Sequence, residues 1–157
     1  MRHERGFTLI EMMVTLAILT VLALLVVPVA ELSVQRTKEQ ALRNALREIR
    51  QAIDAYKLAS EEGRVPRDAM STGYPASLQT LVDGIEDKKH PKRQKVRFLR
   101  RLPRDPFFPD QSVDAAQTWG LRSYASEAND PREGNDVYDI YSRSPQTGLN
   151  GLAYREW

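Results

Sequence analysis

The fold is decided by the stretch Arg5-Gly6-Phe7-Thr8-Leu9-Ile10-Glu11 and by the apolar run that follows it, from Met12 to Ala30. Only Thr15 and Thr20 interrupt this run with polar side chains. An apolar segment of about 20 residues is long enough to cross a bilayer as a helix. Glu11 is the exception, because a carboxylate at the edge of the hydrocarbon is costly unless a cation meets it. The sequence therefore predicts a transmembrane helix whose first turn carries an acid in need of a partner.

The segment from Gly6 to Glu11, with the uncharged run behind it, resembles the class III signal of type IV pilins and of type II secretion pseudopilins. The resemblance implies that a membrane-embedded prepilin peptidase cuts between Gly6 and Phe7, so that residues 1–6 are a leader, and methylates the new amine on Phe7. It also implies that Glu11 of an incoming subunit meets that amine during filament assembly. Such a pair would offset part of the cost of holding either charge in a low-dielectric place.

Two other interpretations of this stretch remain open. Thr8 and Glu11 have the spacing of a capping box, which would make Glu11 a feature of the helix start. An ordinary secretory signal would be cleaved after its apolar core, for example within Val27-Pro28-Val29-Ala30. The short and mixed basic end, which contains Glu4, and the acid at the start of the core do not favour an ordinary signal.

Length and composition limit the number of domains and the kinds of binding site that the chain can form. Its 157 residues allow one modest domain plus a membrane segment, and much of the 41% hydrophobic content precedes Ala30. A net charge of +2 does not by itself indicate a nucleic-acid or membrane-surface partner. Without cysteine, the chain has neither a disulfide nor a thiolate metal site. Many type IV pilins close their C-terminal region with a disulfide, so this absence favours the pseudopilins.

The stretch 31–62 has the pattern of an amphipathic helix. Its apolar stripe recurs every three or four residues and comprises Leu42, Leu46, Ile49, Ile53 and Tyr56, widened by Ala41, Ala45 and Ala52. Residues Arg47, Glu48, Arg50 and Gln51 lie off the stripe, which predicts a solvated or subunit-facing surface. Gly63 and Pro66 predict the end of this helix. Pro28, inside the apolar run, predicts a kink.

Residues 63–157 are expected to form a small head. Pro75–Val82 is predicted as a short helix closed by Gly84, and a strand is predicted over Val137–Ser142. The segment Trp119–Tyr124 resembles the first strand in the small sheet of the major pseudopilins, which implies a strand there as well. The segment Leu102-Pro103-Arg104-Asp105-Pro106-Phe107 resembles a turn of the major pseudopilins, and residues 136–157 resemble their C-terminal end. We interpret the turn as a proline-fixed loop that returns Phe107 and Phe108 to the helix stripe.

These elements together predict an α+β, pilin-like fold, in which a long N-terminal helix, transmembrane and then amphipathic, packs on a small antiparallel β-sheet head. The expected division is a leader (1–6), a transmembrane and fibre-core helix (7–30), an amphipathic helix (31–62) and a periplasmic head with loops (63–157).

The stretch from Lys88 to Arg101 is strongly basic. Its cations are Lys88, Lys89, Lys92, Arg93, Lys95, Arg97, Arg100 and Arg101. Such a run could bind nucleic acid or anionic lipid. The favoured interpretation is a solvated loop facing acidic surfaces of neighbouring subunits, because the run lacks the several aromatic side chains of a stacking platform.

Major pseudopilins carry a calcium-binding loop in the region of the acidic stretch 127–136, which makes Asp130, Glu133 and Asp136 candidate calcium ligands. This stretch is not an EF-hand pattern, and in the tail, where such relatives carry further acids, this chain has Gln146, Thr147 and Asn150. The alternative is a turn-forming acidic loop. No other cofactor is predicted.

Catalysis is not indicated. The two histidines, His3 and His90, lie in the leader and in the basic stretch, so they support neither a metal cluster nor a histidine-based triad. The protein is therefore interpreted as a substrate of processing enzymes.

The resemblance implies a pseudopilin subunit of a type II secretion system, anchored by one span in the inner membrane with its C-terminal domain in the periplasm. It would polymerise into a periplasmic pseudopilus that drives protein export. Its expected partners are further copies of itself, sibling minor pseudopilins, the prepilin peptidase, the inner-membrane assembly platform and membrane lipid. The alternatives are a type IV pilin, a DNA-uptake pseudopilus subunit that uses Arg93, Lys95 and Arg97, and a membrane-anchored binding domain that never polymerises.

Overall fold

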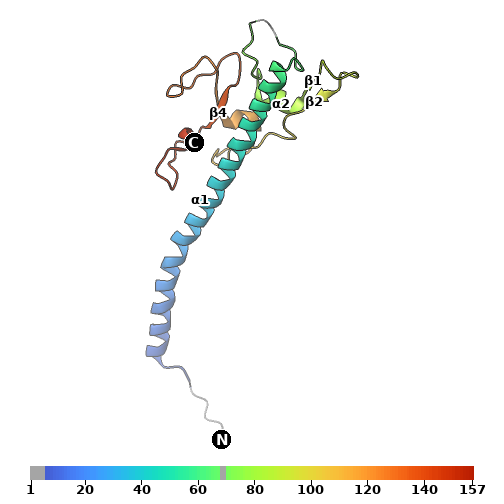
Figure 1. Ribbon diagram of the computed structural model, residues 1–157. Coiled ribbons are helices and arrows are strands. Elements are labelled where there is room, and N and C mark those ends of the chain that lie inside the picture. Colours follow the sequence, from blue (N-terminus) through green and yellow to red (C-terminus); the bar gives the residue numbers. More distant parts are fainter. Residues whose placement is uncertain (1–5, 68–69) are drawn as a thin grey trace. The chain divides into compact units, whose positions relative to one another are not determined.

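A computed structural model of the chain describes residues 6–67 and 70–157, and of residues 25–27 it describes the helix backbone alone (Figure 1). Residues 1–5 of the predicted leader, including His3, lie outside the described residues. The first element is helix α1, Leu9–Glu61, which runs over the two predicted stretches 7–30 and 31–62 as one helix. Pro28 lies inside α1, and the kink predicted there stays a prediction.

The chain divides into two compact units, and the first, which ends at Thr37, contains the apolar part of α1. Its large apolar side chains are exposed, for example Leu9 at 79% and Leu24 at 70%. None of the most apolar 18-residue window of α1 is buried. A run of this length and exposure has the dimensions of a membrane span.

The second unit, Lys38–Trp157, contains the hydrophobic core. The predicted stripe on α1 is confirmed for Leu42, Leu46, Ile49, Ile53 and Tyr56, which are all buried. Of the three alanines predicted to widen it, Ala45 and Ala52 are buried, whereas Ala41 is exposed, because it lies at the edge of the stripe where no other described part of the unit covers it. They pack with apolar side chains from the rest of the unit, among them Leu78, Leu81, Trp119, Val137, Ile140 and Tyr154. Helix α1 ends at Glu61, and Gly63 follows in the left-handed region with φ 71°, as the predicted stop requires.

Two small antiparallel sheets complete the unit. Strands β3 (Trp119–Arg122) and β4 (Asp139–Ser142) pair in the register Trp119↔Ser142 to Arg122↔Asp139. Both strands were predicted, and both are shorter than predicted. Strands β1 (Ile85–Glu86) and β2 (Lys95–Val96) form a second pair inside the region that the sequence left as loop. The α+β class is therefore confirmed.

The short helix α2 runs over Leu78–Asp83, so it begins three residues later than Pro75. The reason is a hydrogen bond between loops: the Val137 amide donates to the Pro75 carbonyl oxygen at 2.8 Å. Ser77 remains extended as the residue before the helix. Gly84 closes α2 with φ 74°, as predicted.

The proline-fixed loop places one of its two phenylalanines in the core. The buried Asp105 accepts hydrogen bonds from the Ser142 hydroxyl at 2.5 Å and from the Phe107 amide at 2.8 Å. Phe107 stacks on the Tyr154 ring with the ring centres 4.0 Å apart. Phe107 thus returns to the core as predicted, whereas Phe108 is not among the side chains packed against it. Two 3-10 helices, η1 (Ala115–Thr118) and η2 (Tyr154–Glu156), lie beside these elements.

Candidate functional site

The bond between Gly6 and Phe7 lies in a non-helical segment ahead of α1. Both residues are exposed, and the Phe7 side chain is 78% exposed. A Cβ atom built on Gly6 would meet nothing within 4 Å, so the described chain places no steric demand for glycine at this position. Exposed, non-helical backbone is the form in which proteases reach a peptide bond. The described fold therefore does not require a small residue at position 6.

Glu11 lies in the first turn of α1 and is exposed. The Glu11 amide donates to the Thr8 hydroxyl oxygen at 3.2 Å, and the Met12 amide donates to the Thr8 carbonyl at 3.2 Å. Thr8 thus caps the helix and forms one half of the predicted capping box. Within the described residues the Glu11 carboxylate makes neither a hydrogen bond nor an ion pair, so it is available to a group outside them.

The two hydroxyls within the apolar run are satisfied inside the helix. Thr15 donates to the Met12 carbonyl at 2.9 Å and Thr20 donates to the Leu16 carbonyl at 2.8 Å. A hydroxyl facing hydrocarbon without such a bond would be costly. These two polar positions are therefore compatible with a lipid-facing helix.

The basic stretch 88–101 covers the β1–β2 turn, strand β2 and the loop after it. All eight of its lysines and arginines are exposed, and none forms an ion pair with a described residue. The preceding acid, Asp87, is instead bound by Arg64, with Oδ2 2.8 Å from Nη2. Burial alone would raise the pKa of Asp87, but the hydrogen bonds from Arg64 and from the Lys89 amide together hold it below its ordinary value. The cations of the stretch are therefore available to a partner.

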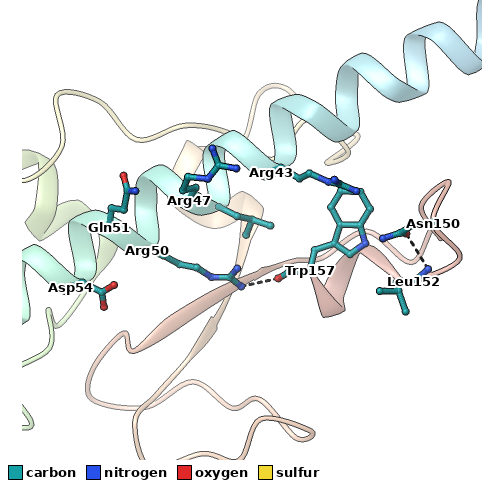
Figure 2. Close-up of a pocket in the computed structure, with 9 residues that line it drawn as sticks. Arg43, Arg47, Arg50, Gln51, Asp54, Asn150, Leu152 and Trp157 are labelled. Carbon is teal, nitrogen blue, oxygen red and sulfur yellow. Dashed lines mark hydrogen bonds between the residues drawn. The ribbon is translucent and has the colours of Figure 1, made fainter.

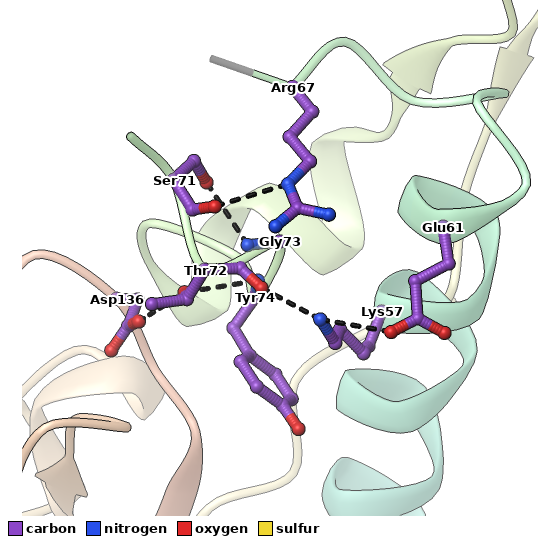
Figure 3. Close-up of polar contacts among 8 residues, drawn as sticks. All are labelled: Lys57, Glu61, Arg67, Ser71, Thr72, Gly73, Tyr74 and Asp136. Atoms are coloured by element: carbon purple, nitrogen blue, oxygen red, sulfur yellow. Dashed lines mark hydrogen bonds and ion pairs between the residues drawn. The ribbon is translucent and has the colours of Figure 1, made fainter. Parts of the chain in front are cut away.

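The three candidate calcium ligands are not gathered into one site. Asp136 accepts a hydrogen bond from the Thr72 hydroxyl (Figure 3). It also accepts one from the Tyr124 amide, and Asp130 forms an ion pair with Arg132. The third ligand, Glu133, is exposed. Over residues 6–67 and 70–157, no group of three or more histidine, aspartate or glutamate side chains could hold a metal ion. Because two of the three carboxylates already bind protein groups, this set does not fit a calcium site.

Two side chains of α1, those of Glu39 and Arg50, bind the C-terminal segment, residues 143–157. The sequence predicted neither of these contacts. Glu39 is buried, and its Oε1 accepts hydrogen bonds from the Leu149 amide and the Tyr154 hydroxyl. Arg50 was predicted to lie on a solvated or subunit-facing surface, but it binds the main-chain oxygen of Trp157 (Figure 2). It also forms an ion pair with Asp139. The signal for Glu39 was its position three residues before Leu42, in line with the apolar stripe. Arg50 gave no such signal, because its partners lie about 90 and 107 residues further along the chain.

Comparison with known proteins finds one family model and several relatives that share one name. The family model of the prokaryotic N-terminal methylation motif matches residues 1–27. The type II secretion system core protein G of Klebsiella pneumoniae is 35% identical over 114 residues, 72% of this chain and 76% of that protein. The protein of the same name from Pseudomonas aeruginosa is 32% identical over 142 residues, 88% of this chain and 92% of that protein. The one from Vibrio cholerae is 27% identical over 139 residues. No solved structure matches the chain significantly.

Proposed function

This chain belongs to the family of type II secretion system core protein G, the major pseudopilins, and from this premise we propose that it is a filament subunit. It is a membrane-anchored protein that takes part in the secretion machinery. In our proposal many copies polymerise, together with sibling minor pseudopilins and on an inner-membrane assembly platform, into a periplasmic pseudopilus that drives protein export. The subunit carries out no catalysis of its own.

Processing comes first in this proposal. A prepilin peptidase cuts between Gly6 and Phe7 and methylates the amine of Phe7. The exposed, non-helical backbone at this bond and the absence of any steric demand for Gly6 support this step. Until assembly, the apolar half of α1 holds the subunit in the inner membrane, with Lys38–Trp157 on the periplasmic side.

Assembly follows from the charge that processing creates. The new ammonium at Phe7 and the carboxylate of Glu11 are opposite charges at the edge of the hydrocarbon, where each is costly alone. Glu11 of one subunit pairs with the Phe7 amine of its neighbour and sets the register between the two helices. The observation that carries this proposal is an exposed acid, without a partner among the described residues, at the head of an exposed apolar helix.

The test compares Glu11→Ala with Glu31→Ala, which removes an exposed acid of the same helix just beyond the apolar run. We expect Glu11→Ala to insert into the membrane at the wild-type level but to yield no filaments by electron microscopy of the assembled system. Glu31→Ala should assemble normally. Normal filaments from Glu11→Ala would refute the assembly role.

Intact-mass spectrometry of the membrane-extracted chain tests processing separately. We expect a polypeptide that starts at Phe7 and carries one added methyl group. A chain that still starts at Met1, or one that starts beyond Ala30, would refute the proposed function. The first result would instead favour a membrane-anchored binding domain, and the second an ordinary secretory signal.

A further inference from the structure

We propose that Glu39 and Arg50 of α1 hold the C-terminal segment, residues 143–157, in place, so that the head keeps its fold without a bound calcium ion. This departs from what the resemblance to major pseudopilins implies for this region. The proposal concerns the fold of the second unit and does not depend on filament assembly.

The chemistry of the segment itself gives the first argument. Between Ile140 and Arg155 the chain contains no aspartate and no glutamate. Calcium prefers several oxygen ligands, with carboxylates prominent among them. This segment offers amide and hydroxyl side chains and backbone carbonyls instead. The carboxylates of the acidic stretch 127–136 do not replace them, because Asp130 and Asp136 are bound to other groups and no three acidic or histidine side chains of the described residues are grouped so that they could hold a metal ion.

The segment closes through its own backbone. The Gly148 amide donates to the Leu152 carbonyl at 2.8 Å, and the Gly151 amide donates back to the Gly148 carbonyl at 2.9 Å. Gly151 takes φ 82°, which favours glycine in this turn. A Cβ atom on Gly148 would lie 2.5 Å from Cζ2 of Trp157, so the turn packs directly against the indole. The loop is therefore a compact turn that two of its own backbone hydrogen bonds close.

Glu39 supplies the centre of this arrangement. Its side chain is buried, with 7% exposure of the residue, and its Oε1 lies 2.7 Å from the Leu149 amide and 3.0 Å from the Tyr154 hydroxyl. A buried carboxylate is costly unless it accepts such bonds, and bonds to an ionised group are stronger than neutral ones. A metal cation would gather oxygen acceptors around itself. Glu39 gathers donors, so the segment is organised around a negative centre.

Arg50 fixes the far end of the segment from the same helix. It lies eleven residues (50 − 39) after Glu39, about three turns, which places both side chains on one face of α1. Its Nη2 donates to the Trp157 main-chain oxygen at 2.8 Å and to the Ile140 carbonyl at 3.2 Å. Arg43 lies between them and stacks over the Trp157 ring at 4.4 Å (Figure 2). Glu39 therefore binds the segment at Leu149 and Tyr154, and Arg50 and Arg43 bind its last residue.

The first experiment measures the dependence of stability on calcium. The chain has two tryptophans, Trp119 and Trp157, and both lie in the second unit, so intrinsic fluorescence reports on that unit within the full chain. We expect full-length protein in detergent to unfold at the same temperature, within about 1 °C, in EGTA and in saturating CaCl₂. A ligand that binds only the folded state raises the midpoint, here by at least about 5 °C at saturation. A rise of that size would overturn the proposal.

The second experiment tests Glu39 itself. We expect Glu39→Ala to lower the midpoint equally in EGTA and in CaCl₂ and to speed hydrogen exchange in peptides covering 143–157. Glu39→Gln should lower the unfolding midpoint less than Glu39→Ala does, because its amide oxygen can accept hydrogen bonds from the same two donors. Glu48→Ala removes an exposed acid of the same helix that makes no hydrogen bond or ion pair to the described residues, and should leave both readouts unchanged.

Wild-type exchange over 143–157 in Glu39→Ala would overturn the role of Glu39. If Glu39→Ala fails to fold, Tyr154→Phe removes one donor to Glu39 and keeps the ring that stacks on Phe107. Faster exchange over 143–157 in Tyr154→Phe supports the proposal, and unchanged exchange overturns it. All these readouts are taken on unassembled protein, so they are independent of the outcome of the Glu11 test.

Discussion

The Arg50 guanidinium, on α1, donates a hydrogen bond to the main-chain oxygen of Trp157 at 2.8 Å, across 107 residues of sequence. The same guanidinium binds the Asp139 carboxylate, with Nε 2.8 Å from Oδ1, at the start of β4. One arginine therefore joins the helix, the sheet and the last residue of the chain. The surrounding side chains line a hollow of about 560 Å³ beside the helix (Figure 2).

Replacement of Arg50 by alanine should destabilise the second unit by about 1–2 kcal/mol. Hydrogen bonds to charged groups contribute more than this when buried, but the Arg50 side chain is 38% exposed and solvent screens it. Arg50→Lys should recover only part of the loss, because an ammonium cannot reproduce the fork of donors. Denaturant unfolding measures both variants. Arg47→Ala, on an exposed neighbour without a bond to the described residues, is the control, and an equal loss in that variant would contradict the assignment.

Gly120→Ala should destabilise the β3–β4 sheet by about 1–3 kcal/mol through overpacking. Gly120 is paired with Tyr141 across the strands, and a Cβ atom there would lie 2.3 Å from the Tyr141 ring. Thermal unfolding measures the loss. In Gly120→Ala combined with Tyr141→Leu, the smaller side chain should relieve part of the clash, so the two effects should not add. Strict additivity would show that the ring is not the obstacle.

Asp87→Asn should destabilise the protein at neutral pH and lose this effect in acid. The folded-state pKa of Asp87 lies below its ordinary value of about 3.9. A depressed carboxyl pKa contributes stability that is complete above the unfolded value and disappears as pH falls through the folded value. Unfolding midpoints of wild type and variant should therefore converge below about pH 4. Glu133→Gln, at an exposed acid without a bond to the described residues, is the control and should unfold like wild type at neutral pH.

The proposed membrane orientation is open to a labelling test, because the chain has no cysteine. Met70 is 97% exposed in the second unit, so Met70→Cys creates a single accessible thiol. An impermeant maleimide added to spheroplasts should label this thiol before the inner membrane is permeabilised. A cytoplasmic marker protein should react only afterwards. Labelling of Met70→Cys that also required permeabilisation would place the second unit in the cytoplasm.

Features that depend on local pattern were predictable from the sequence. The stripe from Leu42 to Tyr56 repeats at helical spacing, and strand β4 is rich in β-forming residues, so both were placed correctly. Strands β1 and β2 were missed because each is two residues long, too short to show an alternation. The start of α2 was misplaced because a hydrogen bond to Val137, distant in sequence, holds the Pro75 region extended.

The residues at the start of α1 could be identified from the sequence, whereas the roles of Glu39 and Arg50 could not. Gly6, Phe7 and Glu11 form a contiguous motif, so the sequence alone identified them, and their roles stay predictions. Glu39 and Arg50 belong to no motif. Their importance comes from partners more than 80 residues away, which only the folded chain brings into contact.

The internal hydrogen bonds of Thr15 and Thr20 have a consequence for the proposed transfer of a subunit from the bilayer into a filament. These two hydroxyls carry their acceptors with them, so neither has to find a new one when acyl chains give way to the side chains of neighbouring helices. In that proposal, extraction moves the apolar run from one apolar environment to another. The cost of moving polar groups then arises at the first turn of the helix, where Glu11 lies.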